Sequence, residues 1–259
     1  MDDVGTKVFN RLLFDGDIFA HRAAHVCSEE FDWGNGLVSN VGDVNEAVGV
    51  FMASINKILR RFDDPAYIIC FSGSRGEGFR RKLYPDYKAD REKSLPLPVL
   101  SRLKKQIMEE YPCAFNAILE ADDLMGILST DNVNQLIVSS DKDMQTIPGW
   151  LYNPDKDVDP RYVTEAAADY DLMLQALTGD STDHYPGLKG VGPVRAQKIL
   201  GRPAFNSVGE MWEKVVAAYE KAEFSEEFAL IQARLARICR TGDFDFDTGE
   251  MTWNPRSCS

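Results

Sequence analysis

The sequence predicts an α/β fold in which a parallel β-sheet is flanked by helices. Three apolar segments of strand length, at 11–14, 66–71 and 134–138, each end in small or acidic residues. Segments with apolar residues at helical spacing lie between them. Because parallel strands need a crossover connection, strands that alternate with helices favour a parallel sheet.

The predicted elements follow one another in a regular order. The strand RLLF, at 11–14, leads through the residues DGD into a helix. The strand AYIICF, at 66–71, is followed by SGS, and the strand NQLIV, at 134–138, is followed by SSDKD. Before the third strand, the segment DDLMGILST at 122–130 has its leucines and isoleucine on one helical face. Ligands of such sheets bind beyond the carboxyl ends of the strands.

Length and composition are those of an ordinary globular protein. The chain has 259 residues, 44% of them hydrophobic and 27% charged. We expect one domain at 1–170 and a smaller helical one at 171–259. No apolar run approaches the roughly 18 residues of a membrane span, and the amino-terminal segment is acidic rather than basic, so the sequence predicts a cytoplasmic protein without a membrane partner. The five scattered cysteines indicate reduced thiols.

Acidic residues are expected to converge at one edge of the sheet. Asp15, Asp141 and Asp143 follow two of the strands, and the turn ILEADD adds Glu120 with its two aspartates, Asp122 and Asp123. Six carboxylates at one edge would repel one another, and a divalent cation would remove that penalty. Mg²⁺ prefers oxygen ligands and takes only a few carboxylates directly, so this number of acids is enough for two ions. The alternative is that each acid only caps a helix.

A basic segment stands out against the formal net charge of −12. The range 75–105 contains ten Lys and Arg residues and four acids, which gives a local net charge of +6. Such segregation suits contact with a phosphate backbone, and Tyr84 and Tyr87 could stack on exposed bases. A solvated loop and helix face is the alternative.

The third informative segment is LTGDSTDHYPGLKGVGPVRAQKIL, at 177–200. Pro193 suits the first position of a helix, and a Gly-Val-Gly turn lets backbone N–H groups approach a phosphate closely. This is the pattern of a helix-hairpin-helix, which binds the DNA backbone without regard to sequence. Upstream of the turn, Asp180 and Asp183 could point back toward the acidic edge. The hairpin residues expected to contact DNA are Gly187, Lys189, Gly190, Gly192, Arg195 and Lys198.

With these motifs the chain resembles the structure-specific 5′ nucleases, the superfamily of flap endonucleases and phage 5′ exonucleases. The resemblance covers most of the chain and rests on LLFDGD, FRRKLYPDYKADR, LEADDLMG, SSDKDMQ, GDSTDHYPGLKGVGPVRAQKIL and ALIQARLARICRTGDFDFD. It is strongest to 5′ to 3′ exonucleases of small tailed bacteriophages. It implies a PIN-like (resolvase-like) sheet domain, a carboxyl-terminal helical domain with a helix-hairpin-helix, and, for a phage protein, the cytoplasm of the host cell.

The resemblance also implies roles for individual residues. One Mg²⁺ would be held by Asp15, Glu120, Asp122 and Asp123, and a second would be held or supported by Asp141, Asp143, Asp180 and Asp183. Mn²⁺ could substitute, and K⁺ often binds the hairpin in relatives. Lys88 and Arg91 would contact the scissile phosphate, Tyr87 would stack on a terminal base, and 75–105 would form an arch over the active site. Arg80, Arg81 and Lys82 of the same segment are also expected to bind DNA.

Two positions depart from the family pattern. The family usually has an Asp after the second strand, where this chain has Ser72, Gly73 and Ser74. Glu77 or Asp17 could take its place. His184 stands where many relatives have Asn, and we interpret it as a turn residue rather than a catalytic base.

The expected function is a monomeric, Mg²⁺-dependent 5′ to 3′ exonuclease with 5′-flap endonuclease activity. Its substrate would be DNA with a 5′ end or flap, and RNA primers in RNA–DNA hybrids are a further option. A catalytically impaired DNA-binding protein and a phosphatase or ribonuclease of the related PIN-like fold are the alternatives. Arg234, Arg237 and Arg240 share a helical face that either touches phosphate or is solvated.

Overall fold

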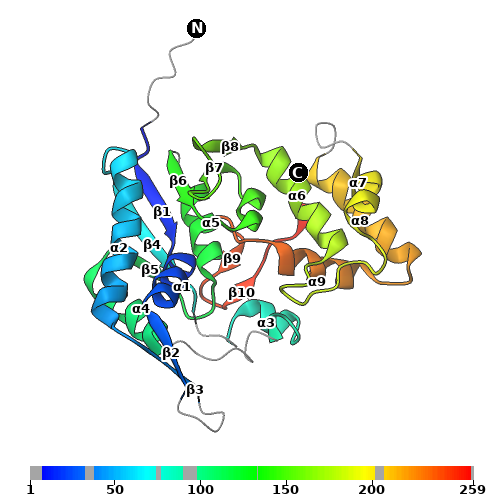
Figure 1. Cartoon of the computed structure of the whole chain (residues 1–259). Coiled ribbons are helices and arrows are strands. Elements are labelled where there is room, and N and C mark those ends of the chain that lie inside the picture. Colours follow the sequence, from blue (N-terminus) through cyan, green and yellow to red (C-terminus); the bar gives the residue numbers. More distant parts are fainter. Residues whose placement is uncertain are drawn as a thin grey trace.

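The computed structural model describes residues 8–32, 38–73, 77–89, 98–132, 134–201 and 207–257. Its centre is a six-stranded sheet with the order β5-β4-β1-β6-β7-β8 (Figure 1). The strands are β1 (Arg11–Asp15), β4 (Ala66–Phe71), β5 (Cys113–Phe115), β6 (Gln135–Val138), β7 (Gly149–Tyr152) and β8 (Arg161–Val163). All neighbours pair in parallel except β7 and β8, which are antiparallel. The predicted parallel sheet is confirmed.

The sheet is buried on both faces because side chains alternate along each strand. In β1, Leu12 and Phe14 face one hydrophobic cluster while Leu13 faces the other. The first cluster contains residues of α1 (Gly16–Val26), α2 (Val44–Arg61) and α4 (Pro98–Glu110). On the other side of the sheet lie the remaining long helices, and Figure 1 shows them on the side away from α2. These are α5 (Ala121–Asp131), α6 (Glu165–Thr178), α7 (Pro193–Leu200), α8 (Val208–Lys221) and α9 (Glu226–Ala236).

Short elements complete the described chain. In the chain, the short helix α3 (Phe79–Leu83) lies between β4 and α4, and the 3₁₀ turn η2 (Lys142–Thr146) lies between β6 and β7. Two antiparallel hairpins are separate from the main sheet. They are β2 (Ser28–Asp32) with β3 (Val38–Gly42) and β9 (Phe244–Asp245) with β10 (Glu250–Met251), and a final 3₁₀ turn, η4, covers Pro255–Ser257.

The expected division between residues 170 and 171 is wrong as a structural boundary, because it falls inside the continuous helix α6. One hydrophobic cluster runs from Leu13 in the sheet to Trp253 near the carboxyl end, so both parts share a core. The expected arch at 75–105 is also too long. Residues 98–105 belong to α4, whose Val99 and Leu103 are fully buried in the cluster with α1 and α2.

Two smaller findings concern the cysteines and the helices. The four cysteines described, Cys27, Cys70, Cys113 and Cys239, are free thiols. None of the helices within the described ranges has the length and apolar character needed to cross a membrane.

Candidate active site

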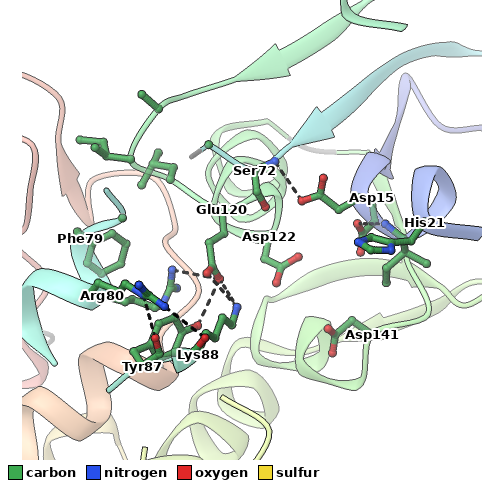
Figure 2. A pocket seen from close by; sticks show the side chains of 18 of the residues that line it. Asp15, His21, Ser72, Phe79, Arg80, Tyr87, Lys88, Glu120, Asp122 and Asp141 are labelled. Carbon is green, nitrogen blue, oxygen red and sulfur yellow. Dashed lines mark hydrogen bonds and ion pairs between the residues drawn. The ribbon is translucent and has the colours of Figure 1, made fainter. Parts of the chain in front are cut away.

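A cavity of about 480 Å³ opens beyond the carboxyl ends of β1, β4 and β6 (Figure 2). Its polar lining comes from segments far apart in the sequence. The lining side chains include Asp15, Asp17, His21, Ser72, Tyr87, Lys88, Lys104, Glu120, Asp122 and Asp141. The expectation that acids from separate strand ends share one edge of the sheet is therefore confirmed for Asp15 and Asp141.

Three carboxylates form the centre of this cavity. Asp15 ends β1 and accepts a hydrogen bond from Ile18 N at 3.1 Å, which caps α1. Asp122 lies in the first turn of α5, and Asp141 caps η2 by accepting from Asp143 N at 2.8 Å. Figure 2 shows their carboxyl groups facing a shared space. Asp15 and Asp141 therefore do cap helical turns, as the alternative interpretation expected, but they also line one shared cavity.

The surroundings of these carboxylates disfavour their charged forms. Burial, and then the charges of Asp17 and Asp141, raise the pKa of Asp15 to about 6, although a hydrogen bond from Ser139 opposes this. Burial also raises the pKa of Asp122, and the charges of Asp15 and Asp141 raise it further. Positive charge in the cavity would relieve this mutual repulsion.

Lys88 supplies one such positive charge. Its Nζ donates to Glu120 Oε2 at 2.7 Å and to Oε1 at 2.9 Å, and it lies 3.5 Å from Asp183 Oδ2. Burial opposes the charged ammonium, but the nearby Glu120 and Asp183 carboxylates outweigh it and raise the pKa of Lys88. Lys88 therefore joins the turn after α3 to the segment before α5 and to the hairpin loop.

A second group of acids lies next to the first. Asp143 Oδ1 accepts from Gln175 Nε2 at 2.6 Å, and Asp180 accepts from Lys142 Nζ at 3.0 Å. Burial and the charge of Asp141 raise the pKa of Asp143 to about 6, against the effect of Lys142. Asp180 and Asp183 contribute in the same direction, so these acids are close enough to interact.

Within the described ranges, no group of three or more His, Cys, Asp or Glu side chains is gathered closely enough to hold a metal ion as the side chains stand. The donor chemistry nevertheless fits a hard divalent cation, because the cavity offers carboxylate oxygens from Asp15, Asp122 and Asp141, and the charge of Asp141 raises the pKa of both Asp15 and Asp122.

Asp123 does not belong to this donor set, and its expected role as a metal ligand is wrong. Its side chain is fully buried, and both oxygens accept from Arg80, at 2.6 Å and 2.7 Å. The Arg80 guanidinium outweighs the effect of burial and holds the pKa of Asp123 below its usual value. Arg80 is itself only 4% exposed, so the expectation that it binds DNA is also wrong.

Tyr87 is not placed to stack on a base. Its side chain is buried, and its hydroxyl group lies 3.1 Å from Asp183 Oδ2 and 3.3 Å from Glu120 Oε2. The ring is covered on its faces by neighbours, with Lys88 Nζ 4.9 Å from its centroid. Tyr87 therefore orients two acids instead of presenting a free aromatic surface.

The other cations of the basic segment differ in exposure. Lys82 is exposed, whereas Arg81 is half-buried and donates from Nε to Tyr87 O at 3.1 Å. Arg91 and the rest of the expected arch at 90–97 lie outside the described residues, as do residues 74–76.

The glycine hairpin divides into a buried and an exposed part. Gly187 is buried and its N–H donates to Gln232 Oε1 at 2.9 Å, so the expected DNA contact at this residue is wrong. Leu188 and Val191 anchor the loop in the core. The remaining expected DNA contacts, Lys189, Gly190, Gly192, Arg195 and Lys198, are all exposed. Pro193 is the first residue of α7, as predicted.

Two features of the cavity were not expected. The buried Ser139 donates from Oγ to Asp15 Oδ2 at 2.8 Å and accepts from Asp141 N at 3.0 Å, so one hydroxyl group ties two acids together. Lys104 of α4 forms an ion pair with Asp17. In the sequence, the only sign of the Ser139 hydrogen bonds was a small polar residue at a strand end. Nothing in the sequence pointed to the ion pair between Lys104 and Asp17.

The residues after β4 differ in the room that they leave for a side chain. A Cβ at Gly73 would lie 2.1 Å from Ala117 O, so the backbone leaves no room for a side chain. Ser72 lines the cavity, where its Oγ accepts from Ala121 N at 2.9 Å. Asp17 is no simple replacement, since it accepts from Ser72 N at 3.1 Å and pairs with Lys104.

The arginines near the end of α9 neither touch the cavity nor form a solvated face. Arg237 and Arg240 are buried and bind Asp169 and Asp243, while Arg234 Nε donates to Trp253 O at 3.0 Å. His184 has a φ of 58°, which agrees with its interpretation as a turn residue.

Comparisons with known proteins agree with this fold. Residues 10–165 match the family described as 5'-3' exonuclease, N-terminal resolvase-like domain. The exonuclease of Escherichia phage T7 is 26% identical over 287 residues, covering 94% of this chain and 93% of that protein. The flap endonuclease Xni of Shewanella woodyi is 27% identical over 218 residues, covering 77% of this chain and 85% of that protein. A crystal structure of the T5 D15 protein with metal ions aligns with a TM-score of 0.64 at 15% identity, covering 88% and 89% of the two chains.

Proposed function

Because the chain belongs to the family of the 5'-3' exonuclease, N-terminal resolvase-like domain, we propose that it hydrolyses phosphodiester bonds of DNA at or near a 5′ end. It acts as a 5′ to 3′ exonuclease and cleaves 5′ flaps with the same residues. The observation that carries this proposal is the convergence of Asp15, Asp122 and Asp141 with Lys88 in one cavity. The names of two relatives, an exonuclease and a flap endonuclease, support the reaction class.

Mg²⁺ is the proposed cofactor, with Mn²⁺ as a substitute. Asp15, Glu120, Asp122 and Asp141 would hold one ion. Asp141, Asp143, Asp180 and Asp183 would hold or support the second. Carboxylate oxygens are the donors that Mg²⁺ prefers. Burial and neighbouring carboxylates raise the pKa of Asp15 and of Asp122, and a bound cation would favour their charged forms. When bound, such ions lower the pKa of water and stabilise charge on the oxygens of the phosphate.

The chain's own groups perform the remaining tasks. Ser139 holds the Asp15 side chain and the backbone of Asp141 in fixed positions through its two hydrogen bonds. Lys88 places a positive charge in the cavity, where it can exchange its carboxylate partners for a phosphate oxygen of the substrate. Because the Lys88 side chain is only 16% exposed, this charge acts more strongly than it would on the surface.

The exposed part of the hairpin is the proposed binding site for duplex DNA. Gly190 and Gly192 have no neighbouring atoms within 4 Å of the position of a Cβ, so a phosphate can approach their backbone. Lys189, Arg195 and Lys198 surround them with positive charge. A phosphate held there is bound without regard to base sequence, which suits an enzyme that recognises DNA ends and flaps.

The proposal is tested with labelled 5′-flap, blunt, nicked and RNA-primed duplexes, each incubated with and without Mg²⁺. We expect 5′ mononucleotides or short flap products only when Mg²⁺ is present. Tight binding of the same duplexes with no product in Mg²⁺ or Mn²⁺ would instead establish the alternative, a DNA-binding protein without turnover. Cleavage that is undiminished in EDTA would contradict the metal dependence.

A further inference from the structure

A buried ion pair lies at the wall of the proposed catalytic cavity, which Arg80 helps to line. The guanidinium of Arg80, in α3, forms two parallel hydrogen bonds with the carboxylate of Asp123, in α5. The two side chains are 4% and 0% exposed. A buried pair of this kind often adds little net stability compared with apolar residues, so its position invites a functional explanation.

The remaining donors of Arg80 bind the carboxyl-terminal part of the chain. Arg80 Nε donates to Leu235 O at 3.1 Å, and Nη2 donates to Arg237 O at 2.7 Å. These carbonyls belong to the last turn of α9 and its cap, where backbone acceptors lack partners within the helix. The planar fork of an arginine is needed for this set, because a lysine ammonium cannot serve two carboxylate oxygens and two carbonyls in fixed directions.

The Asp123 carboxylate also accepts hydrogen bonds from two backbone N–H groups. Oδ2 accepts from Glu120 N at 3.1 Å, and Oδ1 accepts from Cys239 N at 3.0 Å. The first bond fixes the start of α5, so Glu120 and Asp122, on either side of the turn, leave the backbone in set directions. Arg80 Nη1 also lies 3.7 Å from Glu120 Oε2.

We propose that Arg80 and Asp123 are a positioning pair, which holds Glu120 and Asp122 in the arrangement that binds a divalent cation. The pair acts by joining α3, the start of α5 and the end of α9 at one buried point. It touches neither the substrate nor the ion. The proposal rests on the proposed function, because it concerns the same cavity.

A second buried pair in the same chain is a matched control. Arg237 Nε donates to Asp243 Oδ2 at 2.8 Å, and the two residues are 5% and 7% exposed. Asp243 also accepts from a backbone N–H, that of Arg240, at 2.7 Å. This is also an arginine–aspartate pair of similar burial, joined by one hydrogen bond instead of two, but neither residue lines the catalytic cavity.

The experiment compares Arg80→Lys and Asp123→Asn with Arg237→Lys and Asp243→Asn. Thermal melting of each variant is measured by circular dichroism, and Mn²⁺ binding without DNA is measured by electron paramagnetic resonance at a temperature where every variant is folded. We expect all four substitutions to lower the melting temperature. Only Arg80→Lys and Asp123→Asn should weaken Mn²⁺ binding, by about tenfold or more, the usual cost of losing an outer partner of a metal ligand.

Mn²⁺ affinity that is unchanged in Arg80→Lys and Asp123→Asn would overturn the positioning role. Equal weakening in the control pair would do the same, because it would reveal a general effect of lost stability. The proposed function is judged separately from the unsubstituted protein. If that protein binds Mn²⁺ and cleaves DNA while the two test variants keep their affinity, only the positioning proposal fails.

Discussion

Lys88 and Glu120 form an ion pair inside the cavity, with Nζ 2.7 Å from Oε2 and 2.9 Å from Oε1. Lys88 has a φ of 54°, a left-handed backbone conformation that turns its side chain inward at the end of the turn after α3. A lysine with such a costly backbone and a largely buried ammonium is placed for a task in the cavity. Its charge lies beside Glu120 and Asp183, where it can meet a phosphate oxygen of the proposed substrate.

Replacing Lys88 by Met should remove this charge while keeping the length of the side chain. We expect kcat for 5′-end cleavage to fall by about 10²- to 10³-fold, the usual cost of losing one electrostatic contact to the transition state. Single-turnover cleavage with saturating enzyme measures this. Lys82→Met is the control, because Lys82 is exposed on α3 and six residues away in sequence. An equal loss in both variants would indicate a general effect of charge on DNA binding.

Asp141 should be essential for cleavage but dispensable for DNA binding. Asp141→Asn keeps an acceptor for the N–H of Asp143 and removes the negative charge. Loss of an outer partner of a metal ligand costs about 10- to 100-fold, so loss of a proposed ligand should lower kcat by more than about 100-fold. Cleavage rates and fluorescence anisotropy with a 5′-tailed duplex separate the two effects. Full activity of this variant in Mg²⁺ would remove Asp141 from the site.

Asp155→Asn is the matched control for that substitution. Asp155 is also an aspartate beyond the carboxyl end of a strand, β7, but it is half-exposed and paired with Arg22. It does not line the cavity. Its replacement should leave both kcat and duplex affinity close to those of the unsubstituted protein.

Restoring the family Asp at Gly73 should harm the protein. A Cβ at this position meets Ala117 O at 2.1 Å and Asn116 O at 2.4 Å, and backbone atoms cannot move aside as a flexible side chain would. We expect Gly73→Asp to lower the free energy of unfolding by about 1–3 kcal/mol or more, the usual cost of overpacking. Urea denaturation followed by fluorescence measures the change. A variant of unchanged stability and raised activity would contradict this account of the departure.

The exposed hairpin cations should act on duplex affinity and leave the chemical step alone. Replacing Lys189, Arg195 and Lys198 together by Gln should reduce the slope of log affinity against log salt concentration by about 3, since each phosphate contact contributes about 0.9. Binding is measured by anisotropy at several salt concentrations, and kcat at saturating DNA should be retained. A triple Gln variant of the exposed Lys57, Arg60 and Lys105 has the same net charge and should leave the slope unchanged.

The sheet and the convergence of its acids could be predicted from the sequence because both follow from local patterns. Alternation such as Leu12, Leu13 and Phe14 between the two hydrophobic clusters is a property of any strand buried on both faces. Parallel pairing then brings the ends of β1 and β6 together, where Asp15 is the last residue of β1 and Asp141 lies three residues beyond β6. No knowledge of distant contacts was needed.

The roles of Asp123, Arg80 and Gly187 could not be predicted in this way. Asp123 adjoins a proposed ligand, and only its contact with Arg80, 43 residues away, shows that its oxygens are already used. Arg80 lies in a segment whose charge indicates a surface, yet α3 turns it into the core. The burial of Gly187 depends on Gln232, in a helix whose packing against the hairpin no local pattern reveals.

The two glycines Gly187 and Gly190 should differ in their tolerance of a methyl group, although both have positive φ, at 58° and 80°. A Cβ at Gly187 would lie 2.2 Å from Gly179 N and 2.6 Å from Thr178 C, at the end of α6. A Cβ at Gly190 would meet no atom within 4 Å. Gly187→Ala therefore combines backbone strain with overpacking, and we expect a loss of about 3 kcal/mol or more in the free energy of unfolding.

Gly190→Ala adds strain alone, and part of it is offset by the lower entropy of the unfolded chain, so its cost should be about 1 kcal/mol. Urea denaturation of both variants measures the difference. Gly190→Ala should also affect DNA binding directly, because its methyl group lies at the proposed phosphate contact. This variant should remain folded but bind duplex DNA more weakly. Equal destabilisation by the two substitutions would mean that the close contact between Gly187 and Gly179 does not hold the hairpin in place.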